Sequence, residues 1–171
     1  WKNKKILITG HTGFKGGWLS VILNLLGSKV SGFALNPQGK NNFFNCTKIK
    51  KIFKYDFRHD ITDINFLKKS IKKIKPEIIF HLAAQSSVIE SFKNSEKTML
   101  TNVIGTANVL EALKNDKNVK CLIIITTDKV YQNYKFKKYF DESSVLGGDD
   151  VYSGSKACCE ILTNSYKKSF F

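Results

Sequence analysis

The sequence lacks the features that would place it among membrane, secreted or metal-binding proteins. No apolar run approaches the ~20 residues that cross a bilayer, and the N-terminus has no signal-peptide pattern. We therefore expect a cytoplasmic protein with no membrane partner. The four cysteines (Cys46, Cys121, Cys158 and Cys159) have no C-x-x-C spacing, so reduced, mostly buried thiols are expected. The three histidines are isolated from one another, and no metal site is predicted.

Arginine is almost absent although the chain is strongly basic. Lysine and arginine number 28 against 14 acidic residues, a net charge of +14, yet Arg58 is the only arginine. The lysines are spread along the sequence rather than clustered, which favours solvated surfaces over a nucleic-acid interface. We expect no nucleic-acid partner, and the charge is expected to help attract an anionic substrate.

Two hydrophobic periodicities alternate along the chain. Strands are predicted at 4–9, 29–35, 52–56, 77–82 and 119–126, and helices at 14–26, 63–74, 95–114 and 152–171, with polar loops at 36–51 and 132–150. Segment 119–126 is apolar on both faces, as a central parallel strand is. The pattern predicts an α/β fold with a doubly wound parallel sheet.

We interpret residues 1–171 as one dinucleotide-binding domain. Sheets of this type usually continue past a fifth strand, so we expect this one to be truncated after about five strands, with a C-terminal substrate-binding part missing. The helix at 14–26 is predicted to bury Trp18, Leu19, Ile22, Leu23 and Leu26. The helix at 95–114 is predicted to bury Leu100, Val103, Ile104, Ala107 and Leu110.

A glycine-rich turn follows the first predicted strand. Gly10, Gly13 and Gly16 permit a sharp turn, close approach of the main chain to a pyrophosphate, and tight packing of the next helix. That helix directs its free N–H groups at a bound anion. A glycine triplet alone is a weak signal, but here it stands in the strand–helix–strand context that a dinucleotide site requires.

Two polar constellations lie further along the chain. Tyr152 and Lys156 are four residues apart on a predicted helix, so the phenol and the ammonium share a face, and a nearby cation favours the phenolate form of a general base. The segment 126–129, Thr-Thr-Asp-Lys, follows the fifth predicted strand, at the sheet edge where ligands bind. Each has a commoner explanation, a surface helix pair and a capped strand end. Their occurrence together with the glycine turn favours a redox active site.

In combination these motifs resemble the extended short-chain dehydrogenase/reductases, and within them the nucleotide-sugar dehydratases that act on CDP-glucose. The resemblance covers nearly the whole chain. It rests on Trp1-Lys2, residues 9–19, His81-Leu82-Ala83-Ala84-Gln85, residues 101–106, residues 127–129, Leu146-Gly147-Gly148, and Tyr152 with Lys156. Related dTDP-glucose and GDP-mannose dehydratases carry glutamate where this chain has Lys129.

The resemblance implies NAD-dependent conversion of CDP-glucose to CDP-4-keto-6-deoxyglucose by a lyase. Tyr152, assisted by Lys156, would take the proton from the carbon-4 hydroxyl, which Thr127 holds, while hydride passes to NAD. Lys129 would then remove the proton on carbon 5, and Asp128 would protonate the departing carbon-6 hydroxyl. Lys129 can act as a base only when neutral, which requires burial or a nearby positive charge.

The resemblance also implies a set of cofactor-binding residues. In the glycine turn these are Gly10, Thr12, Gly13, Phe14, Lys15 and Gly16. Beyond it they are Asp60 and Ile61 at the adenine edge, Leu82, Ala83 and Ala84 beneath the nicotinamide half, Asn102, Thr126, Tyr152 and Lys156. Asp60 is nearly as well explained as a helix cap, the small residues as strand-end packing, and Asn102 as a solvated helix residue.

Several choices stay open on sequence alone. Asn36 stands where an acidic residue would hold the adenosine ribose 2′-hydroxyl, and Lys40 nearby is placed to meet a 2′-phosphate, so the sequence does not decide between NAD and NADP. The alternatives in function are another nucleotide-sugar epimerase or dehydratase and a nonenzymatic dinucleotide-binding module. The fragment itself is expected to be inactive, and the resemblance implies a homodimer.

Overall fold

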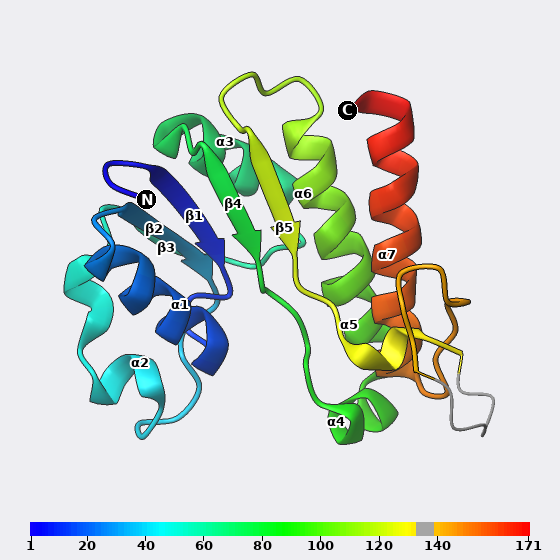
Figure 1. Cartoon of the computed structure of the whole chain (residues 1–171). Helices are drawn as coiled ribbons and strands as arrows, with labels where there is room; N and C mark the ends of the chain where they lie inside the picture. Colours follow the sequence, from blue (N-terminus) through cyan, green and yellow to red (C-terminus); the bar gives the residue numbers. More distant parts are fainter. Residues whose placement is uncertain (133–138) are drawn as a thin grey trace.

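One sheet of five parallel strands organises the part of the chain that this computed structural model describes, residues 1–132 and 139–171 (Figure 1). The strands are β1 (Lys5–Thr9), β2 (Lys29–Ala34), β3 (Asp56–Arg58), β4 (Ile78–His81) and β5 (Cys121–Ile124). Their spatial order is β3-β2-β1-β4-β5, and every pairing is parallel. The order reverses at β1, the point where open α/β sheets bind ligands. The predicted Rossmann-like fold is confirmed.

Helices cover both faces of the sheet. They are α1 (Phe14–Leu25), α2 (Phe43–Cys46), α3 (Ile64–Ile74), α4 (Val88–Lys93), α5 (Ser95–Met99), α6 (Gly105–Leu113) and α7 (Val151–Phe170). Short turns of other helix types are η1 (Ile49–Ile52) and η3 (Asp128–Val130), both 3-10, and η2 (Leu100–Ile104), which is π-helical.

The core is divided in two by the alternation of side chains along β1. Ile6 and Ile8 pack with Leu23 of α1 on one face. Leu7 points to the opposite face and packs with Leu67 of α3 and Val109 of α6. α7 lies beside α6 on this second face, and its first turns approach η3 (Figure 1).

The helix predicted at 63–74 forms as α3. The Asp63 carboxylate accepts a hydrogen bond from the Phe66 amide at 3.0 Å and so caps the N-terminus of α3. Lys75 ends the helix with a φ of 50°, and Pro76 follows. Leu67 and Ile71 are buried in the core.

The stripe predicted for the first helix is buried only in part. Trp18, Ile22 and Leu26 are 47%, 50% and 49% exposed. The buried positions of α1 are Gly16, Gly17, Ser20 and Leu23. Small residues let α1 lie close to the sheet, and the larger apolar residues beside them remain about half exposed to solvent.

The predicted helix at 95–114 is interrupted, and its predicted buried face is wrong at two positions. It consists of α5, the π-helical η2 and α6. Leu100 and Ile104 are 46% and 44% exposed. The buried positions in and before η2 are Thr98 and Asn102, which are polar and find partners elsewhere in the fold. A π turn contains one more residue than an α-helical turn. The residues before η2 are therefore rotated relative to the buried face of α6.

Other boundaries also differ from the prediction. Residues 49–52 wind into η1, so the third strand is Asp56–Arg58 and not 52–56. β5 is shorter than 119–126. In the sheet of the described residues it is an edge strand instead of a central one, paired with β4, and Cys121 is exposed while its other residues are half-buried. The predicted loop at 36–51 contains α2 and most of η1, and α4 was not predicted. Residues 133–138 of the loop predicted at 132–150 lie outside the described residues.

The prediction that the cysteines are mostly buried is wrong. All four thiols are free, and Cys46, Cys121 and Cys158 are exposed while Cys159 is buried. Cys121 is exposed because it begins the edge strand β5.

Candidate cofactor and active site

The glycine turn after β1 is held against the segment that follows β4. Gly10 has a φ of 74°, and a Cβ at this position would lie 2.7 Å from the Ala83 amide nitrogen. A Cβ on Gly16 would overlap the main chain of Gly10, so α1 comes as close to the turn as the backbone permits. α1 starts at Phe14 with no side-chain cap, which leaves its first N–H groups available to an anion.

The other predicted residues of this turn differ in their surroundings. Thr12 donates a hydrogen bond from Oγ1 to the main-chain oxygen of Leu35 at 3.1 Å, which ties the turn to the end of β2. Phe14 is 70% exposed, and Lys15 is also exposed. The lowered pKa of Lys156 has burial as its main cause, with the Lys15 charge a smaller one. Lys15 and Lys156, which are far apart in the sequence, are therefore close enough in the fold for their charges to interact.

Thr9 links the turn to the predicted nicotinamide-side residues. Its Oγ1 accepts hydrogen bonds from the amides of Leu82 and Ala83, both at 3.1 Å. The same oxygen lies 2.7 Å from Nδ1 of His81. Since two N–H groups already donate to this oxygen, its own proton goes to Nδ1, and His81 carries its hydrogen on Nε2.

His81 continues this network into the second half of the fold. Its Nε2 lies 3.1 Å from Thr106 Oγ1, which donates in turn to Cys159 Sγ of α7 at 3.3 Å. Complete burial, with the Lys156 charge as a smaller cause, lowers the pKa of His81 to about 3. His81 is therefore neutral at neutral pH and joins β1, β4, α6 and α7 through directed hydrogen bonds.

Asn102 connects three segments near the predicted active site. Its side-chain oxygen accepts from the Gln85 amide at 2.8 Å, and its Nδ2 donates to the Gln85 carbonyl at 3.0 Å. Nδ2 also donates to Ser155 Oγ at 2.8 Å, and Ser155 donates to the Tyr152 carbonyl at 2.7 Å. Asn102 is 1% exposed, so it is not a solvated helix residue. It holds the chain after β4 against the helix that carries Tyr152.

Tyr152 and Lys156 lie in the first turns of α7. Asp150 caps this helix by accepting hydrogen bonds from the Ser153 amide and hydroxyl, at 3.0 and 2.7 Å. Lys156 is 6% exposed and donates from Nζ to the main-chain oxygen of Ile125 at 3.0 Å. This hydrogen bond holds α7 against the residues that follow β5.

The Thr-Asp-Lys segment lies at the same carboxyl edge of the sheet. Thr127 caps η3 and donates from Oγ1 to Asp128 at 3.0 Å, and Lys129 Nζ lies 3.4 Å from the same carboxylate oxygen. The hydrogen bond from Thr127 is the main cause that lowers the pKa of Asp128. The Lys129 side chain is 55% exposed, so the described residues do not supply the burial that a base requires. Thr126, the residue before this segment, donates a hydrogen bond from its hydroxyl to the Glu160 carboxylate of α7.

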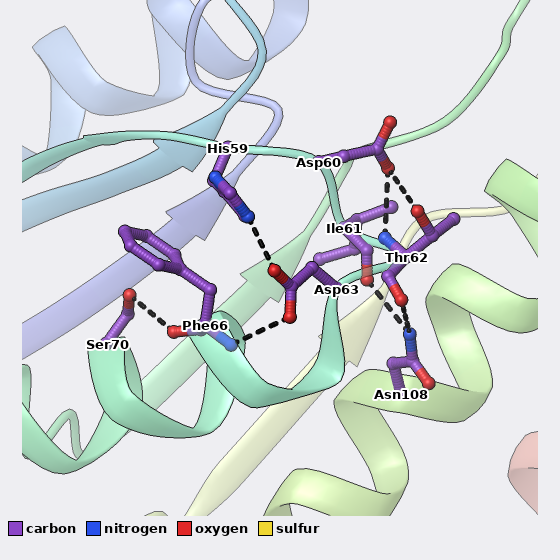
Figure 2. A network of polar contacts seen from close by, with 8 residues as sticks. All are labelled: His59, Asp60, Ile61, Thr62, Asp63, Phe66, Ser70 and Asn108. Atoms are coloured by element: carbon purple, nitrogen blue, oxygen red, sulfur yellow. Dashed lines mark hydrogen bonds and ion pairs between the residues drawn. The ribbon is translucent and has the colours of Figure 1, made fainter.

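The predicted adenine-edge residues lie in a separate polar network at the end of β3 (Figure 2). Oδ1 of Asp60 accepts from both the amide and the hydroxyl of Thr62 at 2.9 Å. Asn108 of α6 donates to the carbonyls of Ile61 and Thr62 at 3.1 and 2.9 Å. The Ile61 side chain is buried in the core, so any contact of Ile61 with a cofactor would use its main chain. Asp63, not Asp60, caps α3.

The described residues contain neither a metal-binding cluster nor a membrane-spanning helix. Across 1–132 and 139–171, no group of three or more His, Cys, Asp or Glu side chains is placed to hold a metal ion. Within the same residues, no helix combines the length and the apolar character needed to span a bilayer.

Several residues that build the site had no role predicted from the sequence. His81, Thr106 and Cys159 form the buried network, and Ser155 joins Asn102 to α7. A histidine within an otherwise apolar central strand is the signal that would have drawn attention to His81. The pair of Thr126 with Glu160 has no comparable signal, since the two are 34 residues apart.

The fold and site define a dinucleotide-binding protein of the short-chain dehydrogenase/reductase type. A family model described as GDP-mannose 4,6 dehydratase matches residues 7–171. The chain therefore belongs to the GDP-mannose 4,6-dehydratase family, and the dehydratase resemblance of the motifs is confirmed.

Individual relatives agree with this family. The chain is 39% identical over 171 residues to a CDP-glucose 4,6-dehydratase of Salmonella typhimurium, covering 100% of this chain and 47% of that protein. A dTDP-glucose 4,6-dehydratase of Bacillus anthracis, solved in complex with NAD, is 26% identical with a TM-score of 0.79, over 98% of this chain and 51% of that one. A UDP-glucose 4-epimerase of Thermus thermophilus, also solved with NAD, is 25% identical with a TM-score of 0.83, over 96% and 51%. The chain thus spans about half the length of these relatives.

Proposed function

We propose that the protein containing this chain catalyses the NAD-dependent dehydration of CDP-glucose to CDP-4-keto-6-deoxyglucose. The observation that supports the proposal is the hydrogen bond between Lys156 and the Ile125 carbonyl, because it holds α7, the helix that carries both Tyr152 and Lys156, against the residues that precede Thr127, Asp128 and Lys129. The 39% identity to a CDP-glucose 4,6-dehydratase along the whole chain supports the choice of substrate.

The residues present fit a dinucleotide. Gly10 and Gly16 keep the turn free of side chains, the uncapped start of α1 and Lys15 suit the pyrophosphate, and the residues that follow Leu82 after β4, Ala83 and Ala84, have small side chains. When bound, NAD supplies the acceptor, and later the donor, of a hydride. Lys156 would contact the nicotinamide ribose, and Asp60 the adenine edge.

The chain's own side chains would move the protons. Tyr152 would accept the proton of the carbon-4 hydroxyl that Thr127 orients, as general acid–base chemistry requires. Oxidation at carbon 4 acidifies the carbon-5 hydrogen, which Lys129 would remove while Asp128 protonates the leaving hydroxyl so that water departs. One proton comes off carbon 5 and one goes to the leaving group, so the pair ends with the same number of protons.

The exposed ion pair of Asp128 and Lys129 needs one change to act in this way. Moving a single proton from Nζ to the carboxylate, across the 3.4 Å that separates them, converts the ion pair into a neutral amine and a carboxylic acid. Burial disfavours charged groups, so a bound sugar that covers the pair would favour the neutral form. The substrate itself would thus supply the desolvation that the described residues lack.

Product analysis tests the proposal. Purified protein that contains this chain is incubated with NAD and CDP-glucose, and NMR should show loss of the carbon-6 hydroxymethyl signals and a new methyl group. GDP-mannose, which appears in the description of the matching family model, and dTDP-glucose are assayed in parallel. A keto-deoxy product from either of these but not from CDP-glucose would move the protein to another dehydratase. A carbon-4 epimer as the product would instead make it an epimerase, and dinucleotide binding without any product would leave a nonenzymatic module.

The proposal includes a homodimer formed through exposed apolar residues of η2 and its neighbours, which we call the η2 patch. Met99, Leu100 and Ile104 are 40–46% exposed, and Ile161 of the adjoining α7 is 55% exposed. Burying these residues against a second copy would remove apolar area from water. Light scattering should show that Ile104→Lys is monomeric while Ile22→Lys, at a similarly exposed isoleucine of α1, is still dimeric.

The cytoplasmic location and the absence of a nucleic-acid partner also stay part of the proposal.

A further inference from the structure

Three segments meet at one main-chain oxygen where the adenosine end of a dinucleotide would lie. The Leu35 carbonyl, just after β2, accepts a hydrogen bond from Thr12 Oγ1 of the glycine turn at 3.1 Å. Nη1 of Arg58, the last residue of β3, donates to the same oxygen at 3.5 Å. In folds of this type the residue after the second strand faces the adenosine ribose. Arg58 is thus placed at the ribose end of the site.

Arg58 is held in this position from two sides. Its Nη2 donates to Asp56 Oδ2 at 2.7 Å, and its guanidinium lies 4.5 Å from the centre of the Phe44 ring. The side chain remains 22% exposed. A guanidinium has five N–H donors, and those not given to Asp56 and Leu35 have no hydrogen bond within the described residues. These donors are available to a ligand.

Among the described residues after β2, no carboxylate stands at the position that would select for a ribose hydroxyl. The position after Leu35 is Asn36, which is exposed. Asp56, which pairs with Arg58, has both oxygens engaged, Oδ1 with His11 Nε2 at 2.8 Å and Oδ2 with Arg58. His11 is fully buried, so Asp56 cannot turn toward a ligand without leaving a buried group unpaired. A carboxylate that accepts from a 2′-hydroxyl also repels a 2′-phosphate, and this repulsion is missing here.

We propose that Arg58 sets the cofactor specificity of this protein by donating to a 2′-phosphate, so that NADP binds as well as NAD. The guanidinium matches phosphate geometry and donates to two oxygens at once. Asp56 fixes its orientation but leaves its outer edge open. The inference rests on the proposed dinucleotide binding and adds to it the identity of the group accepted at the ribose.

Calorimetric titration of protein containing this chain tests the inference without requiring turnover. NAD and NADP are compared, together with AMP and adenosine 2′,5′-bisphosphate, which probe the adenosine end alone. We expect the dissociation constants of NAD and NADP to lie within about tenfold of each other. Arg58→Leu should raise the NADP-to-NAD ratio of dissociation constants at least about tenfold, the loss expected for one charge-assisted contact, and Arg58→Lys should raise it less.

A second substitution keeps the inference testable if Arg58→Leu does not fold. Asn36→Asp leaves the pair of Asp56 and Arg58 intact and introduces the missing carboxylate, which should also raise the ratio at least about tenfold. Lys40→Gln is the matched control, and a larger effect there than at Arg58 would assign the 2′-phosphate to Lys40 and overturn the inference. The inference would also be overturned if the unsubstituted protein bound NAD but bound NADP more than about a hundredfold more weakly. Failure to bind either dinucleotide would instead contradict the proposed function.

Discussion

Lys156 of α7 and Ile125, which follows β5, are joined by a 3.0 Å hydrogen bond from the lysine Nζ to the isoleucine main-chain oxygen. The two are 31 residues apart, and part of the intervening chain lies outside the described residues. This contact fixes where α7 begins relative to the sheet edge. It also places a buried cation, whose pKa burial lowers, beside the residues proposed to act on the substrate.

Replacing Lys156 with Met tests this arrangement. A buried charge adds little net stability relative to an apolar residue of similar size. The free energy of unfolding of Lys156→Met should therefore lie within about 1 kcal/mol of that of the unsubstituted protein. Turnover of CDP-glucose should fall by about two to four orders of magnitude, since Tyr152 loses its neighbouring cation. Lys168→Met, in the exposed last turn of α7, serves as the control. Turnover within threefold of the control would remove Lys156 from the proposed mechanism.

Lys129→Met separates the elimination step from cofactor binding. Lys129 lies outside the glycine turn and is half exposed, so the substitution should leave NAD affinity unchanged within about twofold. Loss of the base should lower the dehydration rate by about two to four orders of magnitude. The measurements are NAD titration and NMR detection of the product, with Lys117→Met as the control. A normal dehydration rate in Lys129→Met would show that another group is the base.

The parts of the fold set by local sequence were predictable. Glycines in a strand–helix context predicted the turn at Gly10, and the helix predicted at 63–74 forms as α3, with Asp63 as its cap. Both signals act within a few residues, because capping and positive φ are properties of short segments.

The parts set by distant polar contacts were not predictable from periodicity. The rule that apolar residues are buried placed Leu100 and Ile104 inside, whereas the interior face carries Thr98, Asn102 and Thr106. These residues are buried because Gln85, Ser155 and His81 satisfy them, and those partners are 13 to 53 residues away. Likewise, nothing local to Arg58 indicates that it meets Leu35, 23 residues earlier.

The buried His81 should make stability depend on pH. The folded state takes up this proton only near pH 3, compared with 6.5 for an ordinary histidine. Between these values the unfolded state binds more protons, so the stability that neutral His81 provides is present above pH 6.5 and is lost as the pH falls. From pH 6 to pH 4 the loss should be about 2.5 kcal/mol, since one pKa unit corresponds to about 1.4 kcal/mol and the unfolded-state histidine is already partly protonated at pH 6.

Urea unfolding across this pH range measures the effect. His81→Gln should lose less stability than the unsubstituted protein between pH 6 and pH 4, by about the same 2.5 kcal/mol. His59→Gln, at a partly exposed histidine that contacts Asp63, controls for the removal of a histidine elsewhere. Parallel pH dependences in the unsubstituted protein and His81→Gln would contradict the buried neutral state.

A pair of glycines separates backbone strain from close approach at the cofactor turn. Gly10 and Gly39 have nearly the same φ, 74° and 71°, but a Cβ on Gly10 would lie 2.7 Å from the Ala83 nitrogen while a Cβ on Gly39 would meet nothing within 4 Å. Gly39→Ala should therefore cost only the strain of a positive φ, about 1 kcal/mol. Gly10→Ala should cost about 1–3 kcal/mol more, the penalty of forcing atoms into a packed region. Because relief of the clash displaces the chain at Leu82 and Ala83, Gly10→Ala should also weaken NAD binding at least about tenfold. Equal losses of stability in the two variants, with NAD affinity retained in both, would mean that the turn does not press against the end of β4 as the structure has it.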